Sequence, residues 1–209
     1  MEQSDVSDIY KQARDPQTEG KALAMMAFSD DVNIRESIAG NPSTPPLVFD
    51  ILAKDAIEVK RALATNIHLV EPYISQLILQ NDDPYLVFAL AKNPVLEAEH
   101  MESISKKFSY APALFISNHN CPEDILRTAY ASMEKEGADA IEMSKKIEMC
   151  KEFINNPSTP LNILAKLFLS YPMYKDRILE NIRFNYPMFE GASDKMLITS
   201  LTRQVTPIY

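Results

Sequence analysis

A stripe of apolar residues recurs along the chain, always in the stretch that precedes an asparagine. Counted back from each asparagine, positions −7, −3 and −2 are apolar in six successive stretches. Spacing of i, i+4 and i+5 places three side chains on one face of an α-helix, whereas a strand would scatter them over both faces. The pattern therefore predicts an amphipathic helix before each asparagine. The eighteen positions are Ile34, Ile38, Ala39, Val59, Leu63, Ala64, Leu86, Leu90, Ala91, Ala111, Phe115, Ile116, Met149, Phe153, Ile154, Tyr174, Ile178 and Leu179.

The asparagines themselves define a repeat of about 25 residues. They are Asn41, Asn66, Asn93, Asn118, Asn156 and Asn181, and the gaps between them are 25, 27, 25, 38 and 25 residues. The string NPSTP follows both the first and the fifth of them as a literal repeat, and Asp15 marks an earlier, more degenerate copy. Because asparagine tolerates the left-handed backbone conformation, we interpret it as the residue that ends each helix.

A second, shorter helix is predicted after each asparagine. Thr44 before Pro45 and Thr159 before Pro160 fit an N-cap followed by proline at the first helical position. Connectors that contain aspartate, such as Asp83, then lead to the helix that carries the next stripe, and we expect the aspartate to cap the N-terminus of that helix. A two-helix repeat of this size cannot bury both helices alone, so neighbouring repeats must stack. The sequence predicts an all-α protein, an α-solenoid of about seven ~25-residue two-helix repeats.

The segment NPSTPPLVFDILAKDAIEVKRALATN, residues 41–66, resembles the leucine-rich repeat variant family, which is related to HEAT-like α-solenoids. The family unit looks like A-x-N-P-x-T-P-x-x-x-L-x-x-L-A-x-D-x-x-x-x-V-R-x-x-V-A, and residues 150–181 match it in part. This resemblance implies a right-handed superhelix. Some members of the family hold an iron–sulfur cluster on clustered N-terminal cysteines. Here the two cysteines are Cys121 and Cys150, so we expect no cofactor and no metal.

Seven repeats, starting near residues 15, 41, 66, 93, 118, 156 and 181, fill residues 15–209 as a single array. Residues 1–14 are expected to form an N-terminal cap or a frayed segment. The one long gap, 38 residues, places an insertion near residues 131–145. Insertions in repeat proteins project from one face, which is often the binding face, but a longer helix or a mobile loop would also explain this one.

The net charge, the apolar runs and the cysteine count argue against several classes of function. The 209 residues carry a net charge of −8, which disfavours a general nucleic-acid binder. Residues 1–104 hold 17 acidic and 8 basic side chains, so this acidity is concentrated in the N-terminal half. No apolar run is long enough to predict a membrane span, and two cysteines cannot form a disulfide framework, so we expect a cytoplasmic protein.

The outward face of the predicted helices becomes apolar and aromatic in the middle of the chain. The segment from Tyr85 to Ala91 is apolar on all sides, which is typical of a helix that is buried or lies in an interface. One interpretation is a partner-binding patch; the other is that the C-terminal repeats or the insertion cover it. The predicted partner-binding residues are Tyr85, Phe88, Tyr110, Leu114, Arg35, Lys60 and Arg61.

No catalytic motif is present. The three histidines lie at different repeat positions, and no phosphate-binding loop or nucleophile motif occurs. We therefore expect a non-enzymatic scaffold that binds another protein or a second copy of itself. The net negative charge disfavours nucleic acid as a partner, and we expect no membrane partner. Two alternatives remain: an acidic decoy or regulatory inhibitor of a nucleic-acid-binding protein, and a HEAT-like DNA-repair glycosylase. A partner of the decoy should dissociate with added salt, and a glycosylase should bind duplex DNA tightly at low salt.

Overall fold

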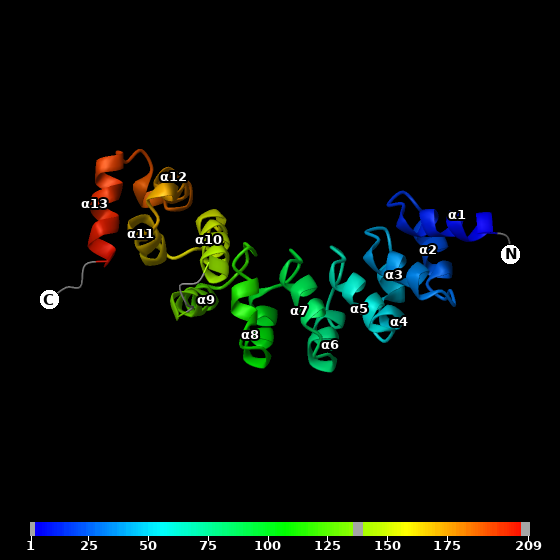
Figure 1. Ribbon diagram of the computed structural model, residues 1–209. Coiled ribbons are helices and arrows are strands. Elements are labelled where there is room, and N and C mark those ends of the chain that lie inside the picture. Colours follow the sequence, from blue (N-terminus) through cyan, green and yellow to red (C-terminus); the bar gives the residue numbers. More distant parts are fainter. Residues whose placement is uncertain (1–2, 136–139, 206–209) are drawn as a thin grey trace. The chain divides into compact units, whose positions relative to one another are not determined.

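The protein is all-helical. The computed structural model describes residues 3–135 and 140–205, and within these ranges it has thirteen α-helices, four 3-10 helices and no β-strand (Figure 1). The chain divides into two compact segments, Met1–Lys107 and Phe108–Tyr209. We call them the first and the second segment. The all-α prediction is confirmed.

The first segment consists of two sets of short helices. The odd-numbered helices α1, α3, α5 and α7 form a row in which each contacts the next, and α6 and α8 contact each other beside it (Figure 1). Helix α1 occupies the first place in the row, so residues 3–14 pack against α3. The helices are α1 (Gln3–Arg14), α2 (Gly20–Met26), α3 (Val32–Gly40), η1 (Pro46–Val48), α4 (Phe49–Leu52), α5 (Ile57–Ala64), α6 (Tyr73–Gln80), α7 (Pro84–Ala91) and α8 (Ala98–Lys107).

The second segment has longer helices. Helix α10 contacts α11 and α12, and α11 contacts α12 and α13. The predicted insertion near 131–145 falls on the end of one helix and the start of the next: α9 ends at Lys135 and α10 begins at Ala140, while residues 136–139 lie outside the described residues. The elements are η2 (Ala111–Leu114), α9 (Glu123–Lys135), α10 (Ala140–Asn155), α11 (Leu161–Ser170), η3 (Pro172–Tyr174), α12 (Lys175–Asn185), η4 (Pro187–Phe189) and α13 (Asp194–Val205).

The recurring apolar stripe forms the core. All eighteen stripe residues are buried except Met149 and Tyr174, which are half-buried. One expected helix is shorter than predicted: the stretch before Asn118 forms only the 3-10 turn η2. Pro112 lies in the first turn of η2, where its missing N–H breaks no helical hydrogen bond. Ala111 and Phe115 are buried nevertheless.

The repeating asparagines do not act as left-handed helix stops, and this part of the sequence analysis is wrong. Among the described residues no residue other than glycine has a positive φ, and Asn41 is extended, with φ −74° and ψ 125°. Its side chain instead bonds backbone groups. Nδ2 donates to the carbonyls of Ala13 and Asp15, at 2.9 and 3.0 Å, and Oδ1 accepts the N–H of Ser43 at 2.8 Å.

The same three bonds recur at Asn66, Asn93 and Asn156. In each case the amide reaches the carbonyls of the preceding asparagine and of the residue two positions before that asparagine. An amide is suited to this role because it offers two donors and an acceptor, whereas a carboxylate offers acceptors only. All of these asparagines are buried. The asparagine is therefore a link between successive sequence repeats.

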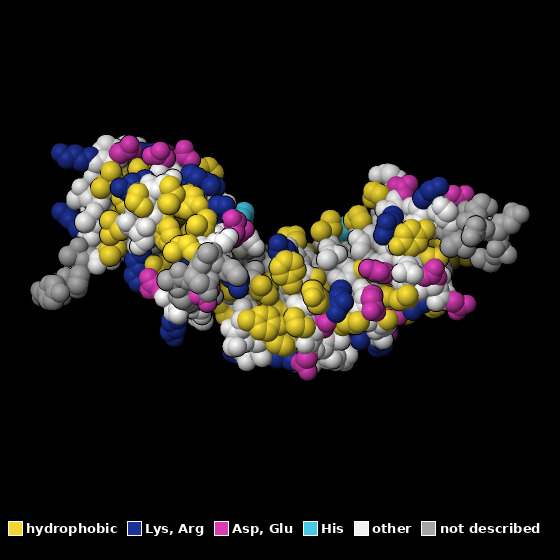
Figure 2. All heavy atoms as spheres, viewed as in Figure 1, with side chains coloured by type: hydrophobic (Ala, Val, Ile, Leu, Met, Phe, Trp, Pro, Cys, Tyr) yellow, Lys and Arg dark blue, Asp and Glu magenta, His cyan; other side chains and the backbone are white. Residues whose placement is uncertain are grey.

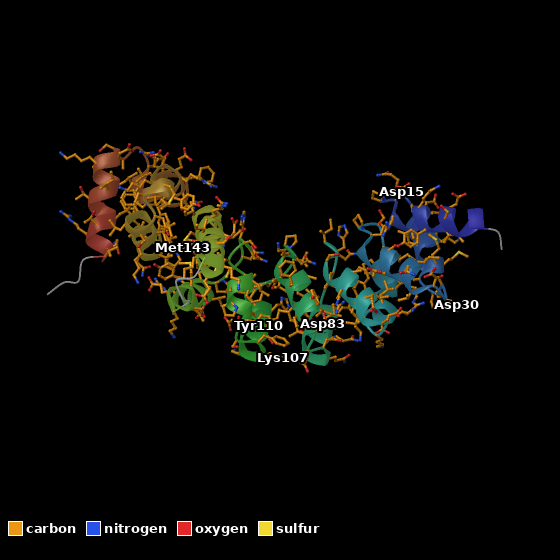
Figure 3. The ribbon with its side chains drawn as sticks, viewed as in Figure 1. Asp15, Asp30, Asp83, Lys107, Tyr110 and Met143 are labelled. Carbon is orange, nitrogen blue, oxygen red and sulfur yellow. The ribbon has the colours of Figure 1, made fainter. Side chains whose placement is uncertain are left out.

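The link begins and ends differently. Asp15, in the turn after α1 (Figure 3), accepts the N–H of Gln17 with Oδ1 at 2.8 Å but has no amide to donate. At the other end, Asn181 lies inside α12 rather than after it. Its Nδ2 donates to Ile154 and Asn156, yet its buried Oδ1 has no hydrogen-bond partner among the described residues.

The threonine N-caps are also corrected. Thr44 Oγ1 donates to the carbonyl of Ile38, and Thr159 Oγ1 to that of Phe153, each at 2.6 Å, so both buried hydroxyls bond the end of the preceding helix. The aspartate caps are confirmed at Asp31, which accepts the N–H of Asn33, and at Asp83, which accepts that of Leu86.

Candidate functional site

Two arginine–aspartate pairs fix the row of helices in the first segment. Arg35 of α3 binds Asp55 through Nε and Nη2, at 2.7 and 2.9 Å, and Arg61 of α5 binds Asp83 in the same way, at 2.8 and 2.6 Å. Two parallel bonds between a guanidinium and a carboxylate fix orientation as well as distance. The side chains of Arg35 and Asp55 are 20% and 12% exposed, so this pair is the better shielded from solvent.

These pairs also change the pKa of their members. The hydrogen bonds from Arg35 lower the pKa of Asp55, and those from Arg61 lower the pKa of Asp83. The carboxylates reciprocally raise the pKa of each guanidinium. Both aspartates therefore stay charged when the protein is folded, and both pairs hold at neutral pH.

Asp83 positions the aromatic residues of α7. It stands at the start of this helix (Figure 3), where one carboxylate caps the N–H of Leu86 at 2.7 Å and holds Arg61 of the neighbouring helix. Two residues later Tyr85 lies under the same guanidinium, whose carbon is 4.9 Å from the ring centroid. Phe88 follows one helical turn further on the same face, with the Lys92 ammonium 4.7 Å from its ring centroid.

We call Arg61, Tyr85, Phe88 and Lys92 the α5–α7 face. Tyr85 is 70% and Phe88 46% exposed, although both are large and largely apolar. In Figure 2 hydrophobic side chains gather over α7, with basic and acidic side chains beside them over α5 and α3. A cation lies against each ring, which favours one orientation of the side chain while both rings stay exposed to solvent.

The other predicted partner-binding residues fall into two groups. Arg35 and Lys60 belong to the first segment and already have partners: Arg35 binds Asp55, and Lys60 Nζ is 3.4 Å from Asn81 Oδ1. Tyr110 and Leu114 belong to the second segment. Tyr110 is 43% exposed and packs on Phe108 with ring centroids 5.6 Å apart, and Leu114 is half-buried.

The sequence analysis missed Lys92 and the pairing role of Asp83. The i, i+4 spacing from Phe88 to Lys92 was a usable signal, since side chains at that spacing meet on a helix. The partner of Arg61 was harder to find, because Asp83 lies 22 residues further along the chain.

The described residues offer neither a reactive thiol nor a cluster of metal-ligating side chains. Burial raises the pKa of the Cys121 thiol to about 12, and Asp124 adds to the effect. Burial raises the pKa of Cys150 as well. Both thiols therefore remain protonated at neutral pH and are poor nucleophiles. Within residues 3–135 and 140–205, no three His, Cys, Asp or Glu side chains converge as metal ligands would.

Comparison with known proteins found no matching family model, no matching curated protein and no matching solved structure. The resemblance to the leucine-rich repeat variant family therefore stays a prediction from the sequence. In the part of the chain that the structure describes, each helix lacks either the length or the apolar character needed to cross a bilayer.

Proposed function

We propose that the chain is a non-enzymatic scaffold that binds another protein, built as a right-handed α-solenoid of about seven ~25-residue two-helix repeats. Two observations support the repeat architecture. The asparagines recur in the sequence at gaps of 25 to 27 residues with one exception, and four of them make the same bonds to the preceding repeat. Such arrays present extended surfaces, which suit a binding role.

The α5–α7 face is the observation that carries the proposed function. A tyrosine and a phenylalanine stand exposed on one helix, next to an arginine and a lysine that restrict them. Tyrosine and arginine are enriched among the few residues that dominate binding energy at interfaces. Side chains that are held before binding also lose less entropy when a partner arrives. We therefore assign direct partner contact to Tyr85, Phe88 and Arg61.

The remaining candidates receive supporting roles. Arg35 and Lys60 bond within the first segment, so we assign to them the positioning of α3 and α5. Tyr110 is exposed enough to contact a partner directly, whereas Leu114 is half-buried. The partner that binds the α5–α7 face can also be a second copy of the chain, in which case the proposal is one of self-association.

The test is a capture experiment with three versions of the protein immobilised on a resin. Wild type is compared with Tyr85→Glu/Phe88→Glu and with the control Met25→Glu/Leu47→Glu, which places the same charges on apolar residues 71% and 74% exposed elsewhere in the first segment. Bound proteins from the cells that produce this chain are quantified by mass spectrometry. We expect a partner that wild type and control retain and the α5–α7 variant loses by at least about tenfold.

Thermal melts of all three proteins accompany the capture, because a variant that unfolds would report on folding alone. Both pairs of substitutions are at exposed positions, where changes in stability are usually within about 0.5 kcal/mol. A partner retained equally by all three folded proteins would overturn the assignment of this face. Loss of the partner from both variants would show that added negative charge, not the face, controls binding.

A further inference from the structure

A groove crosses the loops that follow Asn41, Asn66 and Asn93 in the first segment. It has a volume of about 710 Å³, within the range of about 300–1,000 Å³ typical of ligand sites. Its lining is largely apolar: Leu69 and Ile74 are buried at its base, and Ile67 and Val70 are 51% and 44% exposed. We call it the loop groove.

The charged side chains of the loop groove are acidic. Glu71 and Glu97 line it, and both also line an adjoining pocket of about 380 Å³ together with Glu99. No lysine or arginine is among the lining residues of either space, all of which the structure describes. The carboxylate of Glu97, in the loop groove, and that of Glu99, in the adjoining pocket, have no hydrogen-bond or ion-pair partner among the described residues, so the two spaces together present negative charge that the first segment does not neutralise.

One of the acids is held in place. His100 Nδ1 accepts the backbone N–H of Glu97 at 3.1 Å, so the ring proton is on Nε2. Nε2 donates a hydrogen bond to the carboxylate of Glu71. Ser75 Oγ donates to the same carboxylate at 3.0 Å. The carboxylate of Glu71 is therefore fixed at the junction of the two spaces, which both include His100.

We infer that the loop groove binds an extended peptide segment of a partner protein in which leucine-like side chains alternate with lysine or arginine. In an extended chain successive side chains point to opposite sides, so the aliphatic ones can enter the apolar base while the long basic ones reach the acidic rim. Charge complementarity of this kind also accelerates encounter and excludes acidic competitors. The loop groove shares no residue with the α5–α7 face, so the two proposals stand or fall separately.

The experiment measures fluorescence anisotropy of fluorescein-labelled hexapeptides at low ionic strength. The probe is three Leu-Lys repeats; three Leu-Glu repeats and three Ser-Lys repeats serve as comparisons. The proteins are wild type, Glu97→Lys/Glu99→Lys, Ile67→Ser, and the control Glu19→Lys/Glu190→Lys. The control makes the same change in net charge at exposed acids outside the groove. A thermal melt establishes that each variant is folded.

We expect saturable binding of the Leu-Lys peptide to wild type and control. Glu97→Lys/Glu99→Lys should weaken it by at least about tenfold, and Ile67→Ser should weaken it less. Absence of saturable binding, equal binding of the Ser-Lys peptide, or equal weakening in the control would each overturn the proposal. A wild-type dimer that the groove variant converts to a monomer would identify a second copy of the chain as the occupant, and would overturn it too.

Discussion

The asparagine link is complete in the first segment and incomplete at the end of the second. Asn41, Asn66 and Asn93 each follow a helix, and each Oδ1 accepts the backbone N–H two residues later. Asn181 lies inside α12, where the N–H two residues later is part of the helical hydrogen-bond pattern. Its Oδ1 is therefore buried without a partner. Because α12 continues past Asn181, the asparagine keeps the two bonds donated by Nδ2 and lacks the bond that Oδ1 accepts at the other positions.

The end of α12 partly replaces what a further repeat would supply. Asn185 Nδ2 donates to the carbonyl of Asn181 at 3.0 Å, the bond that the next asparagine makes elsewhere in the chain. A side chain of the same helix thus bonds the carbonyl of Asn181 one turn later. The comparison shows that the amide serves two purposes: it shapes the turn after its own helix, and it ties that turn to the preceding repeat.

The largest effect should come from removing a complete link. Asn66→Ala leaves the buried carbonyl of Ala39 and the N–H of His68 without the side-chain partner they have in wild type, and it removes one of the two bonds to the carbonyl of Asn41, which also accepts the N–H of Thr44. Each unsatisfied buried group costs about 1–3 kcal/mol. We expect Asn66→Ala to reduce the free energy of unfolding by about 3 kcal/mol. Asn181→Ala removes two donors but also an oxygen that is already unpartnered, so we expect about 1 kcal/mol.

Urea unfolding followed by circular dichroism measures both variants. Slopes of the transitions must match wild type before the midpoints are compared, because a changed slope indicates a different unfolding reaction. Equal losses at the two positions would contradict the distinction between a complete and an incomplete link.

A smaller effect is expected from pH. Because the pKa of Asp55 is lower in the folded protein than in the unfolded chain, its pairing with Arg35 stabilises the protein fully above about pH 4. This contribution is lost as the pH falls through the folded pKa. Asp55→Asn should therefore destabilise the protein at pH 7 and make its stability less sensitive to acid than that of wild type.

Urea midpoints at pH 7 and pH 3 test this prediction. Asp194→Asn is the matched control in the second segment, since Asp194 also pairs with an arginine, Arg183, but its side chain is 65% exposed. Exposed pairs contribute little, so the control should follow wild type at both values of pH. An Asp55→Asn variant as acid-sensitive as wild type would contradict the stabilising role of the pair.

Much of the core could be predicted from the sequence, because it depends on local periodicity. The stripe that includes Leu63, Leu90 and Ile178 follows from helical spacing, and the structure buries it. The register of the asparagines was also visible. Their role was not, because each amide bonds backbone groups about 25 residues earlier in the chain, and no local propensity contains that information.

The candidate site was predictable to a similar degree. The apolar character of the segment that contains Tyr85 and Phe88 identified an unusual helix. Which of its side chains stay exposed depends on the row of helices around it, since Val87 of the same segment is buried. The loop groove could not be predicted at all, because three loops separated by about 25 residues each contribute to it.

The most direct test of the proposed function is site-specific photo-crosslinking at the α5–α7 face. A photoreactive phenylalanine analogue replaces Phe88 in one version of the chain and the exposed Leu47 in a control, both expressed in the cells that produce this protein. After irradiation, crosslinked proteins are identified by mass spectrometry. We predict a specific protein attached at position 88 and absent at position 47. No crosslink at position 88, or the same products from both positions, would contradict a partner-binding role for this face.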